Sequence, residues 1–263
     1  MKAGTTWLYQ CLSEHPEIHL PDKELNFFGD QDTWSMGFDW YEKQLESNKN
    51  VTGEFSVFYL AHPYVIPRIY NRYPATKLIV CLRNPIDRSF SHYLHDVRYG
   101  VFDQSLTFNE AAEQFPYLID NSCYSTFIKK YLKYFSPQQM LFLIYEDSLK
   151  DPLQYVQSVY RFLEVDDQFV PPSLKKKIHP SYKPRFNLLE KIIYRRALKV
   201  KALKNYWLDK KIGKATIKML YRLNKRKELP TPTIIEREKL KLYFQPEIKE
   251  LEKLINRPLT EWL

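Results

Sequence analysis

Two periodicities of apolar and polar residues alternate along the chain. Short runs at 77–82 and 139–146 predict strands, because their length and aliphatic content suit a buried sheet, and the stretch 51–55 also reads as a strand. Between these runs, apolar residues recur three or four positions apart, which predicts helices. The predicted helices cover residues 5–14, 86–98, 122–135 and 234–254. A further predicted helix starts at Asp151-Pro152 and continues through residue 163. Strands that alternate with helices are typical of an α/β protein with a central parallel sheet flanked by helices.

The length and composition favour one folded domain. The chain has 263 residues, of which 44% are hydrophobic, so it can bury a substantial core. It contains only six glycines, and no segment has the composition of a flexible linker between domains. We therefore predict a single domain that spans residues 1–263.

The net charge of +9 comes from one late segment. Residues 175–227 contain 19 Lys and Arg against two acids, whereas the rest of the chain contains 21 bases and 29 acids. Within this basic segment, the stretches 188–203 and 210–223 have amphipathic helical spacing. We interpret the segment as a helical lid whose apolar face packs on the domain. Peripheral contact of residues 188–223 with an anionic membrane or a polyanionic acceptor stays open as an addition.

The cysteines and apolar runs limit the location of the protein. Cys11, Cys81 and Cys123 form no C-x-x-C spacing, which argues against a disulfide scaffold or a zinc site and suits a reducing compartment. No apolar run approaches the roughly 20 residues that span a bilayer. We expect a cytoplasmic protein, with membrane association through the basic segment as the alternative.

The chain opens with a loop suited to holding an anion. The residues Lys2-Ala3-Gly4-Thr5-Thr6-Trp7 place an ammonium, a glycine and two hydroxyls at the start of a predicted helix. Backbone N–H groups and the positive end of the helix can then converge on a phosphate or sulfate. In the nucleotide-triphosphate loop the lysine follows the second glycine, whereas here it precedes the glycine by two residues. This order argues against an ordinary ATPase or kinase. Simple N-capping by the threonines is the structural alternative.

A second anion-binding candidate follows the strand predicted at 77–82. Arg83-Asn84-Pro85 ends this strand, and Ser91 lies two turns into the next helix. An arginine and a hydroxyl at the carboxyl edge of a parallel sheet can bind one phosphate. A strand-to-helix turn with a solvated arginine is the alternative.

Together these two motifs resemble those of the sulfotransferases that use 3′-phosphoadenosine 5′-phosphosulfate (PAPS). Further stretches match the carbohydrate and bacterial branch, which includes the heparan sulfate sulfotransferases: Lys23 to Phe28 resembles K-E-x-x-F-F, Gly37 to Tyr41 resembles G-x-x-W-Y, and Gly53-Glu54 with Ser56 and Tyr59 resembles G-E-x-S/T-x-x-Y. The resemblance covers nearly the whole chain. It implies a P-loop-like α/β domain and PAPS as co-substrate, with no metal required.

The resemblance also implies roles for single residues. Lys2 would neutralise the leaving bisphosphate, and the rest of the loop, from Ala3 through Gly4, Thr5 and Thr6 to Trp7, would hold the 5′-phosphosulfate. Arg83 and Ser91 would bind the 3′-phosphate, and Arg185 of the pair Pro184-Arg185 is a weaker candidate for a phosphate contact.

Glu24 is the predicted catalytic base. A carboxylate beside an acceptor hydroxyl or amine can take its proton as the bond to sulfur forms. A surface glutamate paired with Lys23 is the alternative, and the neighbouring Phe27-Phe28 together with the family match favour catalysis. His92 and His95 are rival bases, for which structural roles are favoured.

The sequence departs from the family at two places. Relatives that act on heparan chains carry a lysine after the Glu of the Gly-Glu strand, whereas this chain has Phe55, which puts a heparan-type acceptor in doubt. Family members also carry an apolar strand before the lysine loop. We therefore expect a longer natural chain that supplies this first, central strand.

Other function classes remain as alternatives to a sulfotransferase. A P-loop nucleotide kinase would explain a phosphate-binding loop, and a non-enzymatic protein that binds nucleic acid or another polyanion would explain the basic segment. The order of the lysine and glycine argues against the kinase. The complete donor motif in the acidic remainder of the chain argues against a nucleic-acid partner. We expect a small-molecule or glycan acceptor whose identity, like the oligomeric state, the sequence leaves open.

Overall fold

The computed structural model describes residues 2–21, 24–103, 105–176, 189, 192–193, 216, 219–220, 223–224 and 231–263. The chain divides into two compact units. We call the first the core unit; it comprises Met1–Arg88, Asn121–His179 and Leu240–Leu263. The second unit comprises Ser89–Asp120 and Pro180–Lys239. The predicted single domain 1–263 stays a prediction, and each unit is described by itself.

Most described elements belong to the core unit. Before residue 89 these are α1 (Thr5–Ser13), β1 (Ile18–His19), α2 (Gln31–Ser35), α3 (Gly37–Leu45), β2 (Val51–Thr52), η1 (Tyr59–Ala61), α4 (Val65–Arg72) and β3 (Leu78–Leu82). After residue 120 they are α8 (Tyr124–Tyr131), η2 (Pro137–Gln139), β4 (Met140–Ile144), α9 (Tyr145–Lys150), α10 (Pro152–Leu163) and η3 (Thr260–Trp262). The division between the units falls within α5 (Pro85–Tyr99) and α13 (Ile234–Ile255).

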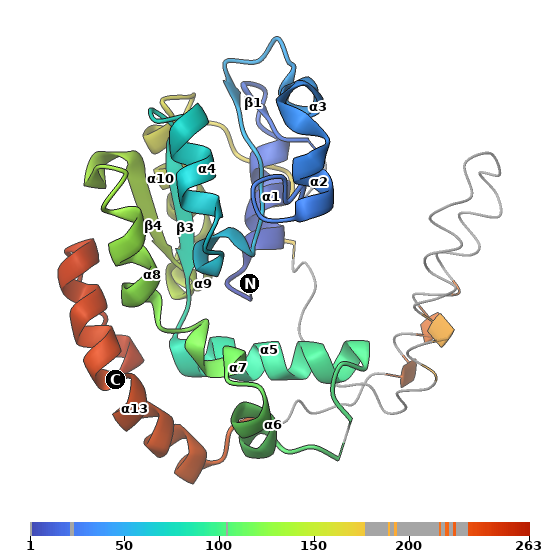
Figure 1. The fold of residues 1–263 in the computed structure, drawn as a ribbon, viewed down its shortest axis with the longest axis vertical. Helices are drawn as coiled ribbons and strands as arrows, with labels where there is room; N and C mark the ends of the chain where they lie inside the picture. The colour runs from blue at the N-terminus through green and yellow to red at the C-terminus, as the bar shows by residue number, and fades with distance from the viewer. Residues whose placement is uncertain are drawn as a thin grey trace. The chain divides into compact units, whose positions relative to one another are not determined.

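Strands β3 and β4 form the centre of the core unit (Figure 1). They pair in parallel, with Leu78 opposite Met140 and Leu82 opposite Ile144. Because successive side chains of a strand point to opposite faces, each face of this ladder carries its own apolar cluster. Ile79, Cys81, Leu141 and Leu143 pack with α1 and α10, whereas Leu78, Val80, Met140 and Phe142 pack with α4, α8 and the aromatic residues of 27–41.

The aromatic cluster on the second face fixes the segment before α2. Phe27 and Phe28 are 0% and 2% exposed. The Phe27 ring stacks on Tyr41 at a centroid distance of 4.4 Å, and Phe28 meets the same ring edge-on at 5.1 Å. Burying two phenylalanine side chains stabilises this segment by roughly 3–6 kcal/mol, taking about 1.5–3 kcal/mol for each side chain. Residues 27–28 are therefore an anchor for the polar residues that precede them.

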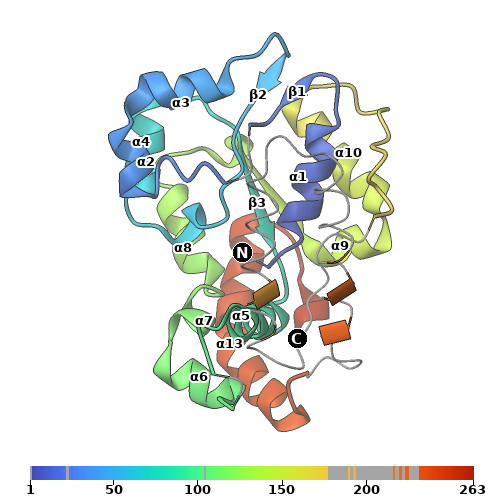
Figure 2. The same cartoon turned by 90° about the vertical axis from the view of Figure 1, so that its right-hand side faces the viewer.

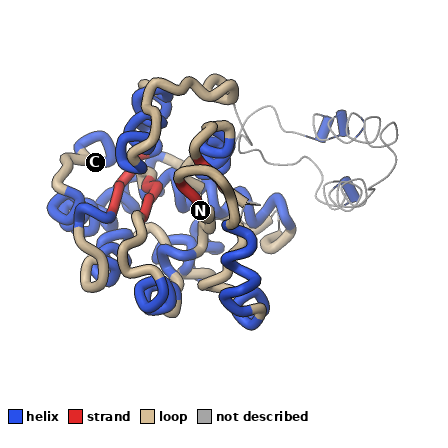
Figure 3. Tube along the Cα trace, turned by 90° about the horizontal axis from the view of Figure 1, so that it is seen from above, coloured by secondary structure: helices blue, strands red, loops and turns tan. Residues whose placement is uncertain are grey.

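The described strands are short, and most of the described chain is helix or loop (Figure 3). A second parallel ladder pairs Ile18 with Val51 and His19 with Thr52. The parallel strands and covering helices confirm the predicted α/β class. Among the described residues, however, they form two two-stranded ladders instead of one continuous central sheet. The expected additional first strand stays a prediction.

The second unit is helical in its described part. Besides its share of α5 and α13 it contains α6 (Phe108–Gln114) and α7 (Tyr117–Asp120). Thr107 and Glu110 form a capping box at the start of α6, which satisfies N–H groups that a helix start leaves unpaired. Its buried apolar residues include Phe90, Tyr93, Leu94, Val97, Phe102, Phe108 and Leu118.

Several predicted elements have different bounds in the structure. The strand predicted at 51–55 pairs only over Val51–Thr52. Beyond Gly53 the backbone bonds to the segment around Glu24 instead, since the carbonyl of Phe55 accepts from Glu24 N at 2.8 Å. The run 139–146 is a strand only to Ile144, since Tyr145 begins α9. The helix predicted at 122–135 is confined to Tyr124–Tyr131.

The other predicted elements agree with the structure to within one or two residues. These are α1, β3, α5, α10 and α13. The helices predicted at 188–203 and 210–223 lie largely outside the described residues. No helix of the described part is long and apolar enough to cross a membrane.

Candidate functional site: an anion-binding corner and a glutamate segment

Gly4 starts α1 in a conformation that favours glycine. It is the N-cap of the helix, with φ +73°, and its carbonyl accepts from the N–H groups of Trp7 and Leu8 at 3.0 and 3.2 Å. A Cβ at this position would lie 2.7 Å from a ring carbon of Tyr145, so the aromatic ring requires the absence of a side chain. Glycine is thus needed for both the backbone and the packing.

The start of α1 has neither a side-chain cap nor an acidic residue in its first turn. Thr5 and Thr6 are the first two helical residues, so the alternative of threonine N-capping is not what the structure has. An uncapped helix start of this kind attracts negative charge.

The remaining residues of the loop have distinct environments. Lys2 has φ +75° and is half-buried, and Ala3 is 3% exposed. The indole Nε1 of Trp7 donates to the carbonyl of Leu174 at 3.2 Å, and its ring packs against Tyr155 at 5.9 Å. Trp7 therefore anchors the chain at the point where the basic segment begins.

Arg83 brings the second predicted motif to this loop. Its Nη1 donates to the carbonyl of Lys2 at 3.2 Å, and its guanidinium lies over the Tyr145 ring at 4.9 Å from the centroid. Both β3 and β4 end at this edge, so the residues that follow them, Arg83 and Tyr145, meet there. In Figure 2 the start of α1 also lies at this end of β3. The structure thus joins Lys2, Gly4 and Arg83 around one tyrosine ring, and we call this the anion-binding corner.

One donor of Arg83 is buried without a hydrogen-bond partner in the part of the chain that the structure describes. Its Nε has no hydrogen bond to any described residue, although it is shielded from solvent. A buried N–H without an acceptor is costly unless a ligand supplies one. This observation fits an anion bound at the corner.

Asn84 and Glu146 fix the backbone behind Arg83. The Asn84 side chain accepts from the N–H groups of Ile86 and Asp87 at 3.0 and 3.3 Å, which caps α5. The backbone N–H of Asn84 donates to one carboxylate oxygen of Glu146 at 3.0 Å. The other oxygen of Glu146 accepts from the Trp262 indole at 3.3 Å. The carbonyl of Arg83 accepts from the Tyr124 hydroxyl at 2.8 Å. Hydrogen bonds therefore fix both the carbonyl of Arg83 and the N–H of the residue that follows it.

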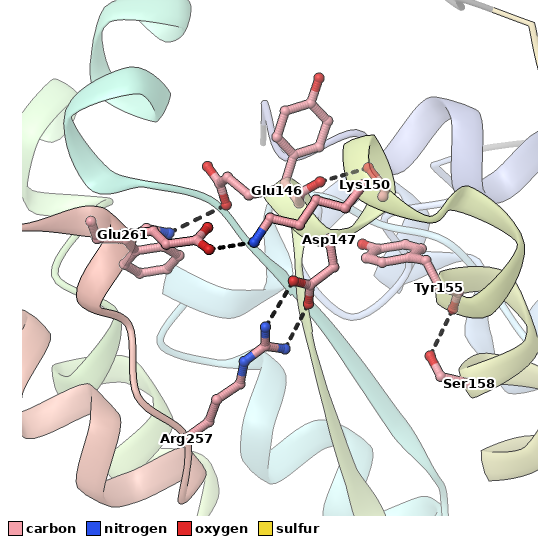
Figure 4. Close-up of polar contacts among 10 residues, drawn as sticks. Glu146, Asp147, Lys150, Tyr155, Ser158, Arg257 and Glu261 are labelled. Carbon is pink, nitrogen blue, oxygen red and sulfur yellow. Dashed lines mark hydrogen bonds and ion pairs between the residues drawn. The ribbon is translucent and has the colours of Figure 1, made fainter.

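The C-terminal segment attaches to α9 through ion pairs (Figure 4). Arg257 binds the Asp147 carboxylate with both terminal nitrogens, at 2.6 and 2.8 Å. Lys150 pairs with Glu261. These pairs keep Trp262 beside Glu146 and thereby support the corner.

Glu24 lies in a separate segment with unusual backbone angles. Glu24 and Asn26 have φ +67° and +53°, a left-handed conformation that is costly for residues with a side chain. Glu24 is half-buried. Its neighbour Lys23 lies outside the described residues, so the surface-pair alternative stays open.

Alternate N–H groups of the glutamate segment, residues 24–28, bond to residues 55–59. Glu24 N donates to the carbonyl of Phe55 at 2.8 Å, Asn26 N to the hydroxyl of Ser56 at 3.1 Å, and Phe28 N to the hydroxyl of Tyr59 at 2.9 Å. The Tyr9 ring of α1 packs edge-on against Phe55 at 5.8 Å, and its hydroxyl donates to the carbonyl of Pro21. This packing links the glutamate segment to the helix that begins at Gly4.

A second carboxyl group lies behind this segment. Burial raises the pKa of Glu54 from 4.5 to about 7, against the opposing effect of the Tyr59 and Ser56 hydroxyls. Neither carboxyl oxygen of Glu54 has a hydrogen-bond partner among the described residues. Glu54 also contributes to raising the pKa of the buried Tyr41, for which desolvation is the main cause.

The rival bases His92 and His95 flank one buried acid in the second unit. The Nε2 of His92 lies 3.7 Å from Asp96 and the Nδ1 of His95 lies 3.1 Å from it, and the Tyr117 hydroxyl donates to the same carboxylate at 2.6 Å. Burial opposes ionisation of Asp96, yet the His95 and Tyr117 bonds hold its pKa below its usual value. This cluster supports a structural role for the two histidines.

The structure does not bring two further predicted phosphate contacts into the described part of the core unit. Ser91 lies on α5 in the second unit and is 5% exposed. Arg185 falls outside the described residues.

The described residues contain no group of three or more His, Cys, Asp or Glu side chains that could hold a metal ion.

Sequence reasoning recognised Gly53-Glu54 with Ser56 and Tyr59 as a family motif but gave it no role, and it missed Tyr145 and Glu146. Tyr145 could have been found from its place directly after an apolar run, since residues at the carboxyl ends of parallel strands gather at one edge. The contact of Ser56 and Tyr59 with the glutamate segment has no comparable signal.

Comparison with known proteins identifies the family of this chain. The family model of the sulfotransferase domain matches residues 1–187, and the chain therefore belongs to the sulfotransferase family. A crystal structure of a sulfotransferase from Alicyclobacillus acidocaldarius aligns with a TM-score of 0.67 and 26% identity, over 99% of this chain and 94% of that one.

Curated relatives match parts of longer proteins. The membrane-associated sulfotransferase kil1 of Dictyostelium discoideum is 35% identical over 105 residues, which are 38% of this chain and 22% of that protein. The bifunctional heparan sulfate N-deacetylase/N-sulfotransferase 4 of Mus musculus is 27% identical over 288 aligned residues, covering 100% of this chain and 30% of its own length. Heparan sulfate glucosamine 3-O-sulfotransferase 5 of Mus musculus is 26% identical over 176 residues, 62% of this chain and 51% of that protein. The chain thus spans at most about half the length of these relatives.

Proposed function

We propose that the protein transfers the sulfuryl group of PAPS to a hydroxyl or amine of a carbohydrate or another small acceptor. The observation that carries this proposal is the corner where the backbone of Lys2, the start of α1 without a side-chain cap and Arg83 meet. Among the described residues, the Arg83 Nε has no hydrogen-bond partner there. Membership of the sulfotransferase family supports the reaction class, and heparan sulfate relatives support a glycan acceptor. The alternative of a nucleotide kinase has no such support.

The residues of the corner suit a doubly phosphorylated donor. Lys2 neutralises the charge that develops on the leaving phosphate, while Gly4, Thr5 and Thr6 hold the 5′-phosphosulfate at the helix start. Arg83 binds the 3′-phosphate, and Ser91 and Arg185 are further candidates for phosphate contacts. A guanidinium held over an aromatic ring keeps its fork in one orientation, which favours a phosphate over a freely moving counterion.

Glu24 acts as the general base in this proposal. Its carboxylate takes the proton of the acceptor hydroxyl or amine while the acceptor atom forms its bond to sulfur. The bond from sulfur to the phosphate oxygen breaks, and its electron pair stays on the 5′-phosphate of the leaving 3′,5′-bisphosphate. General-base catalysis of this kind contributes about 10²- to 10⁴-fold in rate.

The substitution Glu24→Gln tests this assignment. It keeps the shape of the side chain but removes the base, so transfer of labelled sulfate from PAPS to acceptors in a cell extract should fall by roughly 10²-fold or more. Binding of adenosine 3′,5′-bisphosphate, measured by calorimetry, should stay unchanged because Glu24 is not part of the anion-binding corner. Retention of most of the transfer activity would remove Glu24 as the base.

The cellular setting extends this proposal. The membrane-associated relative and the basic residues of 188–223 support peripheral contact with an anionic membrane, while the bulk of the protein stays on the cytoplasmic side. Binding to vesicles that contain anionic lipid, compared with neutral vesicles, tests this contact.

A further inference from the structure

The peptide group that joins Arg83 to Asn84 is hydrogen-bonded on both of its sides. Its carbonyl accepts from the hydroxyl of Tyr124 at 2.8 Å, and its N–H donates to one carboxylate oxygen of Glu146 at 3.0 Å. A trans peptide group is planar and directs its C=O and N–H oppositely, so these two bonds fix its rotation. Because β3 fixes the chain before Arg83, the bond from its Cα to its side chain has one direction.

Trp262 contacts the residues that hold or follow this peptide group. Its indole Nε1 donates to the second oxygen of Glu146 at 3.3 Å. Its backbone carbonyl accepts from the side-chain amide of Asn84 at 3.4 Å, and its ring lies 6.2 Å from the ring of Tyr124. Trp262 is 2% exposed. A buried tryptophan thus connects the turn after β3 with α8 and α9.

The segment 257–263 is attached to α9 next to the same glutamate. Arg257 binds the carboxylate of Asp147 with both terminal nitrogens, at 2.6 and 2.8 Å (Figure 4). Asp147 directly follows Glu146 in α9. The ion pair and the hydrogen bonds of Glu146 therefore join the same turn of α9 to the segment that carries Trp262.

The position of Glu146 requires two acceptor oxygens. One oxygen accepts from the backbone N–H of Asn84, and the other accepts from the indole N–H of Trp262. An ionised carboxylate only accepts, whereas the amide of glutamine has one acceptor and one donor group. Glutamine can therefore satisfy one of the two N–H groups and directs its own N–H groups at the other.

We propose that Trp262 and Glu146 are positioning residues for Arg83, which hold the peptide group 83–84 so that the guanidinium faces the 3′-phosphate of the sulfate donor. The proposal rests on the function proposed for Arg83, and neither positioning residue touches the donor. Two observations at the guanidinium agree with a fixed orientation. It lies over the Tyr145 ring, and its buried Nε has no hydrogen-bond partner among the described residues. Such a donor contributes to binding only when its direction matches the ligand.

Trp262→Phe is the central test, because it keeps an aromatic ring and removes the indole N–H. Calorimetry should show a roughly threefold to tenfold loss of affinity for adenosine 3′,5′-bisphosphate, as for the loss of about one hydrogen bond. The affinity for adenosine 5′-phosphate should change by less than about twofold, because the start of α1 holds that phosphate. A general loss of folded protein would lower both affinities alike, so the selectivity between the nucleotides separates positioning from stability.

Glu146→Gln tests the need for two acceptors. It should weaken the bisphosphate to a similar extent, because one N–H group then faces the donor side of the new amide. In the double variant with Trp262→Phe the indole N–H is gone, and the glutamine oxygen can accept from Asn84 N. The double variant should therefore bind the bisphosphate no worse than Trp262→Phe alone. Losses that multiply would show that the two residues act independently and would overturn the proposal.

Two variants serve as controls. Trp40→Phe makes the same substitution in the aromatic cluster of the core unit, where Trp40 lies 6.2 Å from the ring of Phe27. Lys150→Ala removes an exposed ion pair with Glu261, a kind of contact that contributes little. Both variants should keep the affinities for the two nucleotides. A selective loss of bisphosphate affinity in Trp40→Phe equal to that in Trp262→Phe would overturn the positioning role.

Hydrogen exchange of the Asn84 amide, measured without nucleotide, separates this inference from the proposed function. Trp262→Phe should accelerate this exchange, because Glu146 loses one of its two donors. If Arg83→Ala weakens both nucleotides equally, the role proposed for Arg83 fails; accelerated exchange then still supports the link from Trp262 to Asn84, and an unchanged rate overturns it. If Arg83→Ala weakens the bisphosphate selectively but Trp262→Phe changes neither the selectivity nor the exchange, Arg83 keeps its role and the positioning role is wrong.

Discussion

The anion-binding corner and the glutamate segment both contain left-handed residues, but different parts of the chain hold them. At the corner, Gly4 has φ +73° and lies against the ring of Tyr145, at an edge where two parallel strands end. In the glutamate segment, Glu24 and Asn26 are held by hydrogen bonds from their amides to residues 55 and 56. The corner relies on steric fit and helix geometry, whereas the segment relies on hydrogen bonds from its amides to residues 55–59.

This difference determines how each region should respond to change. A corner built on backbone shape resists changes of pH but tolerates no added atoms. Beside the residues that bond the glutamate segment, the buried carboxyl of Glu54 makes stability depend on protonation. The predictions below follow from this contrast.

The largest effect is expected from the pH dependence of stability at Glu54. Its pKa is about 7 in the folded protein against 4.5 ordinarily, so the folded state binds more protons between these values. The stabilisation is fully present below pH 4.5 and is lost as pH rises through 7, by on the order of 3 kcal/mol at most. Chemical denaturation of the wild type and Glu54→Gln between pH 4.5 and 8 measures this difference.

An exposed glutamate provides the control for this measurement. Hydrogen bonds from Arg72 and Tyr73 lower the pKa of Glu42, so its contribution to stability is present above its ordinary pKa and lost as pH falls. Glu42→Gln should therefore change the pH dependence in the opposite direction from Glu54→Gln. Parallel pH curves for the wild type and Glu54→Gln would contradict the raised pKa.

Arg83→Ala should produce the next largest effect, at the corner. Removing a charged hydrogen-bond donor to a phosphate costs about 1.5–3 kcal/mol, which corresponds to a loss of roughly 10- to 100-fold in affinity. Calorimetry should show this loss for adenosine 3′,5′-bisphosphate and a much smaller one for adenosine 5′-phosphate. Equal weakening of the two nucleotides would exclude the 3′-phosphate as the partner of Arg83.

The two regions also differ in how far the sequence predicts them. The sequence reveals the loop 2–7 and the motif Arg83-Asn84-Pro85, because the residues of each are consecutive and lie next to a helix start or a strand end. Asp151 and Pro152 likewise predict the start of α10, where the Asp151 side chain accepts from Gln154 N at 2.9 Å. Local signals of this kind predicted α1, α5, α8, α10 and α13, but not α2, α3, α4, α6, α7 or α9.

The support of the glutamate segment was beyond sequence reasoning for a physical reason. Ser56 and Tyr59 contact amides that lie 30 and 31 positions away, and hydroxyl-to-amide bonds leave no periodicity. The strand predicted through Phe55 fails for a related reason, because the carbonyl of that residue bonds to Glu24 instead of to a neighbouring strand. Tyr145 was read as the end of a strand, since an aromatic residue after an apolar run fits both a strand and a helix start.

A pair of glycine substitutions separates steric fit from backbone conformation at the corner. Gly4 and Gly37 have similar φ angles of +73° and +79°. A Cβ at Gly4 would lie 2.7 Å from the Tyr145 ring, whereas a Cβ at Gly37 would meet no described heavy atom within 4 Å outside its chain neighbours and its own helix backbone. Gly37→Ala should therefore cost about 1 kcal/mol of unfolding free energy from strain alone. Gly4→Ala should cost about 1 kcal/mol more, since overpacking adds to the strain.

Binding of adenosine 3′,5′-bisphosphate shows whether the extra cost at Gly4 concerns the site. Because Tyr145 also underlies Arg83, a displaced ring moves the guanidinium, and Gly4→Ala should weaken the bisphosphate severalfold while Gly37→Ala leaves its affinity unchanged. Equal thermal destabilisation by the two substitutions, with equal affinities, would mean that the ring yields to the added methyl group. The corner would then be defined by its backbone alone.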